Sequence, residues 1–450
     1  MHLIFQRAEL TVVAAVDNFD GLLGVRGGRP SSQREREVQK RVQLGDMTLV
    51  TVMDVEQLIQ ESEWFHRGWT FQEGLLSRRV LVFTDSQLYW NCCVMTQMES
   101  IYVPMKVSHN SDGSQWSEWM PYGIFTRSSK RDLQTSTESH TEVQENPTSS
   151  PDSDQDSDQD SSEDEDALMY SVVCRDITQY TSRKLSDTKD SLNAFKGVMQ
   201  MYVAGINSNT RFILGLPIVI GPGLNVNSAF AYVLYDWDSE YGCRRSHLPS
   251  WSWAGWGART LIGICSEKYS YYITYRSGYV SYCPELRLVE DLDDPRGIPV
   301  ETILEETRCF DRYATLRVVK PYKIGKMHAS LRVMMNISLS KDIPEVLPAR
   351  EDFAFVLISC DQETLTEPRF LILEPIDENQ RVWERVGAAS VVPDCAVIIS
   401  KRDLKTIYPD SESIPDDRNE LWRHWESLST FVDLIKLANL VPAEVDYFIK

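Results

Sequence analysis

One short segment concentrates the residues that could do chemistry. Over residues 64–77 the large apolar side chains recur at helical spacing and fall within an arc of about 160° on a helical wheel. Glu73 lies at the edge of this arc, next to Trp69, where partial burial would raise the pKa of its carboxyl group. Such a group could act as a general acid or base, or accept a hydrogen bond from a sugar hydroxyl. The alternative is an ion pair with Arg78 or Arg79.

A polar residue also interrupts the apolar arc itself. Gln72 lies near the middle of it. Leaving a buried carboxamide unpaired costs about 1–3 kcal/mol, so Gln72 is expected to have hydrogen-bond partners. Two interpretations remain open: the side chain ties the helix to a neighbouring backbone edge, or it faces a ligand.

A second group of candidate residues is a tryptophan cluster. Period-two spacing predicts that Trp251 and Trp253 share one face of a strand, and Trp256 follows closely. Exposed, these rings could stack on sugars or on Pro-rich peptides. Buried, each would remove about 150–250 Å² from water. Pro249 and Gly255 bracket the run like a tight turn, which favours a core role.

Other local motifs for catalysis are missing. The sequence has no G-x-x-x-x-G-K-[ST], no G-x-S-x-G and no G-x-G-x-x-G pattern. The Gly-rich run Gly24–Pro30 could bind an anion or form a simple turn. Nine cysteines without a C-x-x-C pair and seven scattered histidines predict reduced thiols and no metal site. The reduced thiols favour a cytoplasmic protein.

The net charge of the chain bears on which kinds of molecule it can bind. The 450 residues carry 46 Lys and Arg against 66 Asp and Glu, a formal charge of −20. Residues 138–166 hold 12 of the acids and no Lys or Arg, which leaves about −8 for the rest of the chain. This balance argues against nucleic acid and anionic membranes as partners, because both need a basic face. No apolar run reaches the roughly 18 residues of a membrane span, and no signal or transit peptide is recognisable.

The pattern along the chain predicts an α+β protein in three parts. A mixed α/β region covers residues 1–103, with a strand over Leu10–Val16, a helix starting at Asp54 and a hairpin near Val80–Cys92. Residues 104–184 are expected to form a disordered acidic linker. Residues 185–450 are expected to form a mainly antiparallel β domain, with one helix over Ser191–Tyr202 and a terminal helix over residues 417–440. The strands expected there are Ala229–Asp236, Tyr269–Tyr275, Ala314–Val319, Leu331–Met335, Phe353–Ser359, Arg369–Glu374, Arg381–Val386 and Ala396–Ser400.

Several strings together resemble one family. W-F-H-R-G-W-T-F-Q-E-G-L-L-S-R-R-V-L-V-F, followed by L-Y-W-N-C, resembles the closing signature of the fungal heterokaryon-incompatibility (HET) domain. D-S-L-N-A-F-K-G-V, R-R-S-H-L-P-S-W-S-W-A-G-W and W-E-R-V-G resemble the region that follows the domain in many members. The matching positions are Arg67, Gly68, Trp69, Thr70, Gln72, Glu73, Leu76, Ser77, Arg79, Trp90 and Cys92, then Leu192, Asn193, Ala194, Gly197, Pro249, Ser250, Trp251, Ser252, Trp253 and Ala254.

The resemblance implies a function. HET proteins are intracellular modules of non-self recognition and programmed cell death in fungi, and they act through association with other proteins. HET domains have also been likened to TIR domains, some of which cleave NAD; under that alternative Glu73 is the candidate acidic residue and NAD the only cofactor. The usual opening strand L-S-Y-x-W-G does not occur here, so the sequence is expected to begin inside the domain. An inactive relic that serves only as a binding scaffold is the third interpretation.

Overall fold

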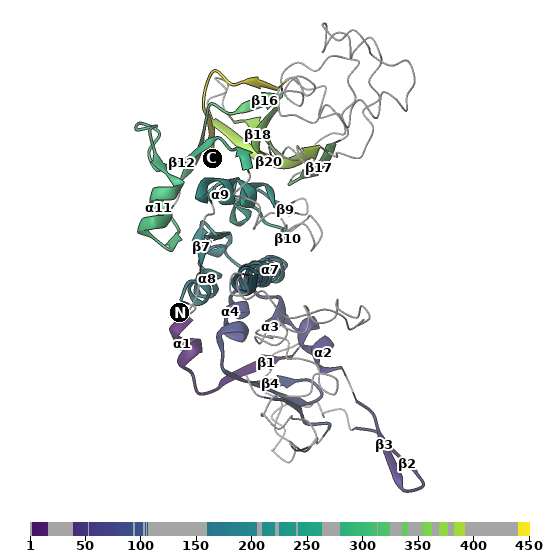
Figure 1. Ribbon diagram of the computed structural model, residues 1–450. Coiled ribbons are helices and arrows are strands. Elements are labelled where there is room, and N and C mark those ends of the chain that lie inside the picture. Colours follow the sequence, from purple (N-terminus) through teal and green to yellow (C-terminus); the bar gives the residue numbers. More distant parts are fainter. Residues whose placement is uncertain are drawn as a thin grey trace, which may run out of the picture. The chain divides into compact units, whose positions relative to one another are not determined.

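The computed structural model describes the chain in two units. The described residues are 2–16, 39–52, 54–92, 95–101, 104, 106, 160–204, 209–220, 225–239, 242–262, 280–312, 314–324, 335–340, 353–361, 369–376, 382–391 and 440–450. Unit 1 comprises residues 1–155 and 182–204, and unit 2 comprises residues 156–181 and 205–450. The architecture is mixed α+β, as the sequence predicts (Figure 1).

Unit 1 is built on a four-stranded sheet in the order β1-β4-β5-β6. Its strands are β1 (Thr11–Ala15), β4 (Arg79–Thr84), β5 (Leu88–Cys92) and β6 (Thr96–Met98). β1 and β4 are parallel, whereas β4, β5 and β6 are successively antiparallel. The expected first strand and the expected hairpin are therefore confirmed.

Unit 1 also contains short helices. They are α1 (His2–Arg7), α2 (Val55–Glu61), α3 (Glu63–His66), α4 (Gly68–Leu76) and α8 (Lys196–Val203). Helices α2 and α3 contact the sheet through β4 and β1, whereas α1, α4 and α8 contact one another. Asp54 caps α2 by accepting hydrogen bonds from the backbone N–H groups of Glu56 and Gln57, at 3.0 and 3.2 Å. The aliphatic side chains Val55 and Ile59 of α2 join Trp64 and the strands in one buried cluster.

Two predictions about unit 1 are wrong. The segment 64–77 is not one helix, because the backbone is extended at Arg67, between α3 and α4. The predicted helix over Ser191–Tyr202 starts only at Lys196, after a 3-10 turn over Thr188–Asp190. A hairpin that the sequence did not predict, β2 (Arg41–Leu44) with β3 (Met47–Val50), forms a separate two-stranded sheet.

Part of the predicted linker is helical. In unit 2, α7 runs from Asp160 to Thr181. From Tyr170 onward it buries a stripe of side chains at intervals of three and four residues: Tyr170, Val173, Cys174, Ile177 and Tyr180. This stripe gives the helix a packed face, which is why the expectation of disorder through residue 184 is wrong for the described residues.

A second correction concerns the predicted strand over Ala229–Asp236. This segment belongs to helix α9 (Val226–Tyr235). Its aromatic and β-branched residues favour a strand in isolation. Asn225, however, caps a helix by accepting a hydrogen bond from Ser228 N at 2.9 Å, and the helix is buried on nearly every side. A helix that is apolar all round lacks the amphipathic period by which it could be recognised.

The described part of unit 2 is otherwise rich in antiparallel strands. An eleven-stranded sheet has the order β13-β12-β15-β22-β20-β19-β18-β16-β21, with β11 on β18 and β17 on β20. All its pairs are antiparallel except β20 with β22. Its strands are β11 (Val280–Tyr282), β12 (Glu285–Val289), β13 (Ile298–Pro299), β15 (Thr315–Val319), β16 (Tyr322–Ile324), β17 (Met335–Leu339), β18 (Ala354–Asp361), β19 (Arg369–Pro375), β20 (Val382–Val391), β21 (Leu440–Pro442) and β22 (Tyr447–Ile449).

Smaller elements complete this unit. A three-stranded sheet joins β7 (Thr210–Ile213), β8 (Leu216–Val219) and β14 (Cys309–Phe310), and a pair joins β9 (Trp237–Ser239) and β10 (Thr260–Ile262). Helix α11 spans Val300–Glu306.

Four of the predicted strands are confirmed, as β15, β18, β19 and β20. Tyr269–Tyr275 and Ala396–Ser400 lie outside the described residues. So do Leu331–Met335, apart from Met335, and the terminal helix over 417–440, apart from Leu440, which starts β21.

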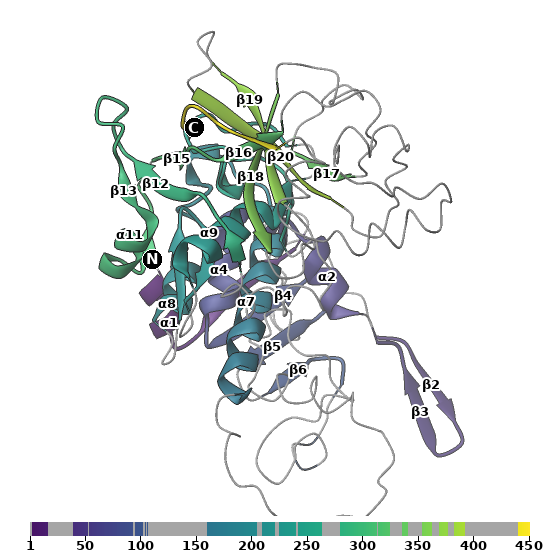
Figure 2. The ribbon, with the colours of Figure 1, turned by 45° about the horizontal axis from the view of Figure 1, so that its top comes forward.

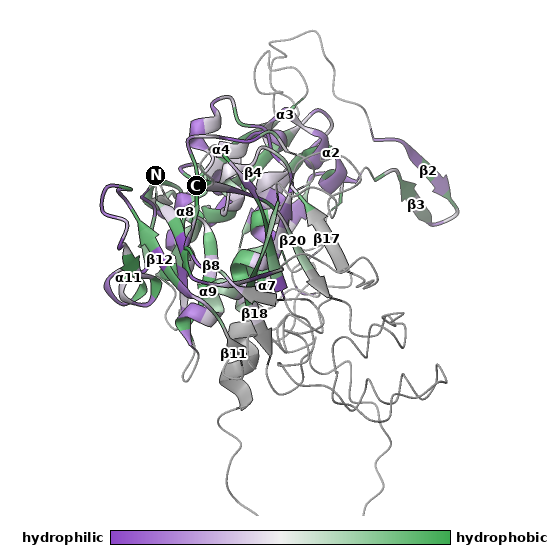
Figure 3. Cartoon of the chain, turned by 90° about the horizontal axis from the view of Figure 1, so that it is seen from above, coloured by the Kyte–Doolittle hydropathy of each residue, from purple (hydrophilic) through white to green (hydrophobic). Residues whose placement is uncertain are grey.

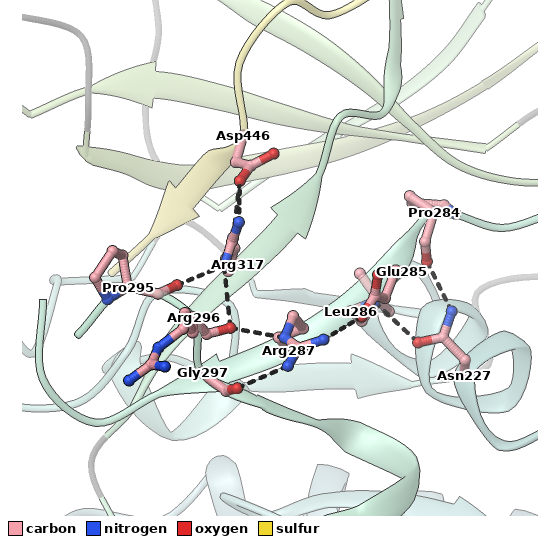
Figure 4. A network of polar contacts seen from close by, with 10 residues as sticks. All are labelled: Asn227, Pro284, Glu285, Leu286, Arg287, Pro295, Arg296, Gly297, Arg317 and Asp446. Atoms are coloured by element: carbon pink, nitrogen blue, oxygen red, sulfur yellow. Dashed lines mark hydrogen bonds and ion pairs between the residues drawn. The ribbon is translucent and has the colours of Figure 1, made fainter.

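An arginine network fixes one end of the large sheet (Figure 4). Arg317 of β15 donates to Asp446 Oδ2 from Nε at 2.8 Å and from Nη2 at 2.5 Å, and to Pro295 O at 2.7 Å. Arg287 of β12, directly opposite, donates to Gly297 O at 3.0 Å. Carbonyl and carboxylate oxygens therefore separate two guanidinium groups that would otherwise repel each other across the strands.

Candidate functional site

The site in unit 1 begins at the break between α3 and α4. Arg67 has φ −83° and ψ 135°, and it forms a parallel bridge with Lys184. Gly68 N donates to Lys184 O at 2.7 Å, and Lys184 N donates to His66 O at 2.6 Å. A Cβ at Gly68 would lie 2.4 Å from a methyl carbon of Leu185, so only glycine allows this close approach without a shift. The break therefore results from docking of the segment that follows α7.

The Thr70 side chain bridges backbone groups on the two sides of the break between α3 and α4. Its hydroxyl lies 2.5 Å from Trp64 O and 2.6 Å from Arg67 O, the two backbone acceptors that flank the turn. Arg183 Nη1 in turn donates to the Thr70 oxygen at 3.4 Å. The signature threonine thus satisfies backbone groups that the interrupted helix leaves open.

Arg183 is the central cation of the site. Its guanidinium carbon lies 4.1 Å from the centre of the Phe65 ring and 4.9 Å from that of Phe71, and the residue is 7% exposed. A cation–π contact stabilises a folded protein by about 2 kcal/mol or more when the cation is desolvated, as it is here. Arg183 could not be recognised from the sequence, because nothing in the local pattern Ser182–Leu185 reveals aromatic partners more than a hundred positions away.

The string Asp190–Val198 packs against the same helices. Phe195 stacks on Phe71, with ring centres 6.1 Å apart and an interplanar angle of 22°. Trp69 Nε1 donates to Asp190 Oδ2 at 3.1 Å. Leu192, Ala194 and Gly197 are buried, while Asn193 is exposed. These residues were predicted to belong to the second domain but lie in unit 1, so the boundary predicted at residue 184/185 does not match the units.

The carboxamide of Gln72 lacks the hydrogen-bond partners that the sequence predicts for it. It is 1% exposed, and neither Nε2 nor Oε1 has a hydrogen-bond partner. The prediction that this carboxamide has partners, by bonding to a neighbouring backbone edge, is wrong for the structure. The interpretation of Gln72 as a ligand-facing amide remains a prediction.

Glu73 is partly buried, as its sequence position predicts, but its carboxyl group bonds to Trp64 instead of to Arg78 or Arg79. Burial raises the pKa of its carboxyl group, against the opposing effects of a hydrogen bond from Trp64 and of the charge of Arg67. The indole Nε1 of Trp64 donates to Glu73 Oε2 at 3.2 Å. Arg79 instead lies 3.2 Å from Glu9, at the exposed end of β4. Burial therefore keeps the proton on the Glu73 carboxyl group to higher pH than usual, although the hydrogen bond from Trp64 favours the ionised form.

The remaining signature residues hold the helix on the sheet. Leu76 is fully buried, and Ser77 Oγ lies 2.6 Å from Thr11 Oγ1 of β1. Trp90 and Cys92 are half-buried neighbours on β5. These contacts position α4 and do not by themselves form a reactive centre.

The tryptophan cluster lies in unit 2 and is core. Trp251, Trp253 and Trp256 are fully buried, which confirms the core interpretation. They do not share a strand face, because the chain forms a turn there followed by a 3-10 helix over Trp253–Gly255. Two of the three indole N–H groups are satisfied internally, because Trp253 Nε1 donates to Gly215 O and Trp256 Nε1 to Ser250 O, both at 2.9 Å. The buried Trp251 Nε1 has no hydrogen-bond partner among the described residues.

Polar side chains lock this turn. Ser252 Oγ donates to Leu214 O at 2.6 Å, and Arg244 Nη1 donates to Leu248 O at 2.6 Å. A Cβ at Gly255 would lie 2.3 Å from Pro249 O, so the backbone leaves no room for another residue type. The R-R-S-H-L-P-S-W-S-W-A-G-W string therefore encodes packing.

The described residues show neither a metal-binding cluster nor a membrane-spanning helix. Among the residues with described positions, no group of three or more His, Cys, Asp or Glu is placed to hold a metal ion. Within the same part of the chain, no helix is long and apolar enough to cross a membrane.

The chain is thus an α+β protein whose first unit joins a broken signature helix to a later docking segment. Residues 1–73 match the family model described as Heterokaryon incompatibility protein (HET), so this segment is similar to that family. The match ends at Glu73, inside α4. No curated protein and no solved structure matches the chain.

Proposed function

We propose that the chain is a heterokaryon-incompatibility-type protein, an intracellular module of non-self recognition and programmed cell death in a fungus. The observation that carries this proposal is the match of residues 1–73 to the HET family. Its mechanism is regulated association with other proteins, with unit 2 as scaffold. The formal charge of −20 supports protein partners over nucleic acid.

The arrangement of unit 1 supports a role for the docked segment in this activity. Arg183, Asp190 and Phe195 hold the signature helices through a cation–π contact, a hydrogen bond and a ring stack. A surface that recognises another protein must be held in one geometry, because ordering it on binding lowers the affinity. Loosening the docked segment is therefore expected to weaken the activity without touching the partner directly.

Inducible expression in a fungal cell tests the proposal. We expect the full chain to cause cell death, and Arg183→Gln to reduce it several-fold at equal protein level, measured by counts of viable cells and by immunoblot. The matched control is Arg312→Gln, which removes a 74% exposed side chain paired with Glu290 and should leave killing unchanged. If the unaltered chain does not kill, the proposal fails and the scaffold interpretation gains support.

A second candidate function is NAD cleavage, which one observation favours. Glu73 is a half-buried carboxyl group with a raised pKa, held by a hydrogen bond from Trp64. In this alternative only, we propose Glu73 as the acidic residue of a TIR-like NAD-cleaving site, where its ionised carboxylate stabilises the positive charge that develops on the ribose as neutral nicotinamide leaves and water adds.

Nicotinamide release from NAD distinguishes the two candidates. Under the enzymatic alternative, Glu73→Ala and Glu73→Gln both lower the rate, by about a hundredfold or more. The rate of the unaltered chain falls as the pH drops through the raised pKa of Glu73, because the carboxyl group then gains a proton and loses its negative charge. Glu61→Gln on exposed α2 is the matched control. No nicotinamide release from the unaltered chain would discard the enzymatic alternative and leave the association proposal intact.

A further inference from the structure

The hairpin of β2 and β3 extends away from α2 and from the four-stranded sheet of unit 1 (Figures 1 and 2). Its turn is short: Gly45 has a φ of 59°, as the first central residue of a type II′ turn requires. The register pairs Val42 with Leu49 and Leu44 with Met47. Because side chains alternate across a strand, these four aliphatic residues share one face of the hairpin.

That face is open to solvent. Its side chains are more than half exposed: Val42 57%, Leu44 51%, Met47 67% and Leu49 53%. The opposite face carries Arg41, Gln43, Thr48 and Val50, with a hydrogen bond from Thr48 to Gln43 at 2.7 Å. Figure 3 shows the hydropathy of the hairpin, in which hydrophilic and hydrophobic residues alternate along β2, while β3 is mainly hydrophobic. The hairpin is therefore an amphipathic ribbon with an uncovered apolar side.

The contacts within the hairpin alone are not enough to make it stable. A two-stranded hairpin is at best marginally stable in water, and it needs a covered apolar face or further strands. The alternation of four apolar residues on one side with polar residues on the other is a pattern that ordinarily marks a half-buried sheet. A partner that covers the apolar face would remove these side chains from water and so stabilise the hairpin.

The charges at the two ends of the hairpin indicate what covers it. Lys40, which continues the ladder by its backbone bonds with Thr51, has the same parity as Val42 and Leu44. Asp46 lies in the turn at the opposite end, and both charged residues are exposed. One end of the apolar face is thus basic and the other acidic. An identical hairpin laid across it in the antiparallel sense brings Asp46 of each copy to Lys40 of the other.

We propose that this face is a self-association surface, on which the hairpin of a second copy of the chain packs antiparallel about a two-fold axis. The contact is isologous, so every residue of the patch meets a residue of the same patch. Four aliphatic side chains bury less than the about 800 Å² per partner of a stable interface. The dimer is therefore weak and reversible, suited to association that depends on local concentration. The inference does not depend on whether the chain causes cell death.

Sedimentation velocity of the full chain, from low to high micromolar concentration, tests the proposal. We expect a monomer–dimer equilibrium that Leu44→Ser with Leu49→Ser weakens roughly tenfold or more. The matched control is Val50→Ser, which removes an apolar side chain from the opposite face of the same strand and should leave the equilibrium unchanged. Circular dichroism checks that each variant keeps the fold, as expected for exposed positions.

Charge exchange tests the antiparallel sense. Lys40→Asp alone or Asp46→Lys alone should weaken the dimer by roughly two- to fivefold, more at low salt than at high salt. The double variant should restore the association, because each contact then regains opposite charges. A chain that stays monomeric at every concentration overturns the proposal and leaves the face for a different protein. A Val50→Ser effect equal to that of the leucine pair, or a double variant weaker than either single one, also overturns it.

Discussion

Replacing Trp253 by Ala should destabilise unit 2 by about 3–5 kcal/mol and unfold it cooperatively. The side chain is fully buried, its indole N–H donates to Gly215 O at 2.9 Å, and its ring meets Tyr180 edge-on at 5.9 Å. Truncation removes all three contacts and leaves Gly215 O without its donor. Because native stabilities are of order 5–15 kcal/mol, this loss is a large fraction of the total.

Hydrogen–deuterium exchange resolved by peptide measures this effect in each unit. Protection in β15 and β19 of unit 2 should fall sharply, while protection in β4 of unit 1 reports the other unit. The matched control is Ile376→Ala, at a 54% exposed position of unit 2, where we expect a change within about 0.5 kcal/mol. A folded Trp253→Ala variant of normal stability would contradict the core role and favour a binding role for the cluster.

Replacing Gln72 by Met should have the opposite sign and raise the stability of unit 1 by about 1–3 kcal/mol. The buried carboxamide of Gln72 has no hydrogen-bond partner, so the structure bears the cost of removing it from water without compensation. Methionine has a similar length, favours helices and adapts to irregular space. Denaturant unfolding, followed by exchange in β4, measures the gain.

Gln57→Met is the control for this prediction. Gln57 is exposed on α2 in the same unit and bonds only to the exposed side chain of Glu61, so its replacement should be nearly neutral. If Gln72→Met instead destabilises the protein by 1 kcal/mol or more, the carboxamide has a partner in solution. That result would support the ligand-facing interpretation of Gln72.

Elements with local signals could be predicted from the sequence. Asp54 predicts the start of α2 because its side chain caps the first turn. The β4–β5 hairpin can be predicted from two apolar runs on either side of a short turn. The failures have long-range causes. The break at Arg67 depends on backbone bonds to Lys184, and α9 is a helix in spite of its strand-like composition because it is buried on nearly every side.

The candidate site could be predicted only in part, for the same reason. The signature residues and the raised pKa of Glu73 follow from one helix and its arc. The partners of that helix do not: Trp69 meets Asp190 at a sequence separation of 121, and Thr70 meets Arg183 at 113. No period or motif within a segment encodes which distant segment will pack on it.

The path of the chain has a consequence for how this protein can change over generations. Unit 1 is drawn from two stretches, and residues 156–181 of unit 2 lie between them in sequence. A recombination event that transferred only residues 1–103 would separate the signature helix from Arg183, Asp190 and Phe195. Substitutions at the residues of unit 1 that precede residue 156 are therefore constrained by residues 182–204, and the two stretches are expected to co-vary.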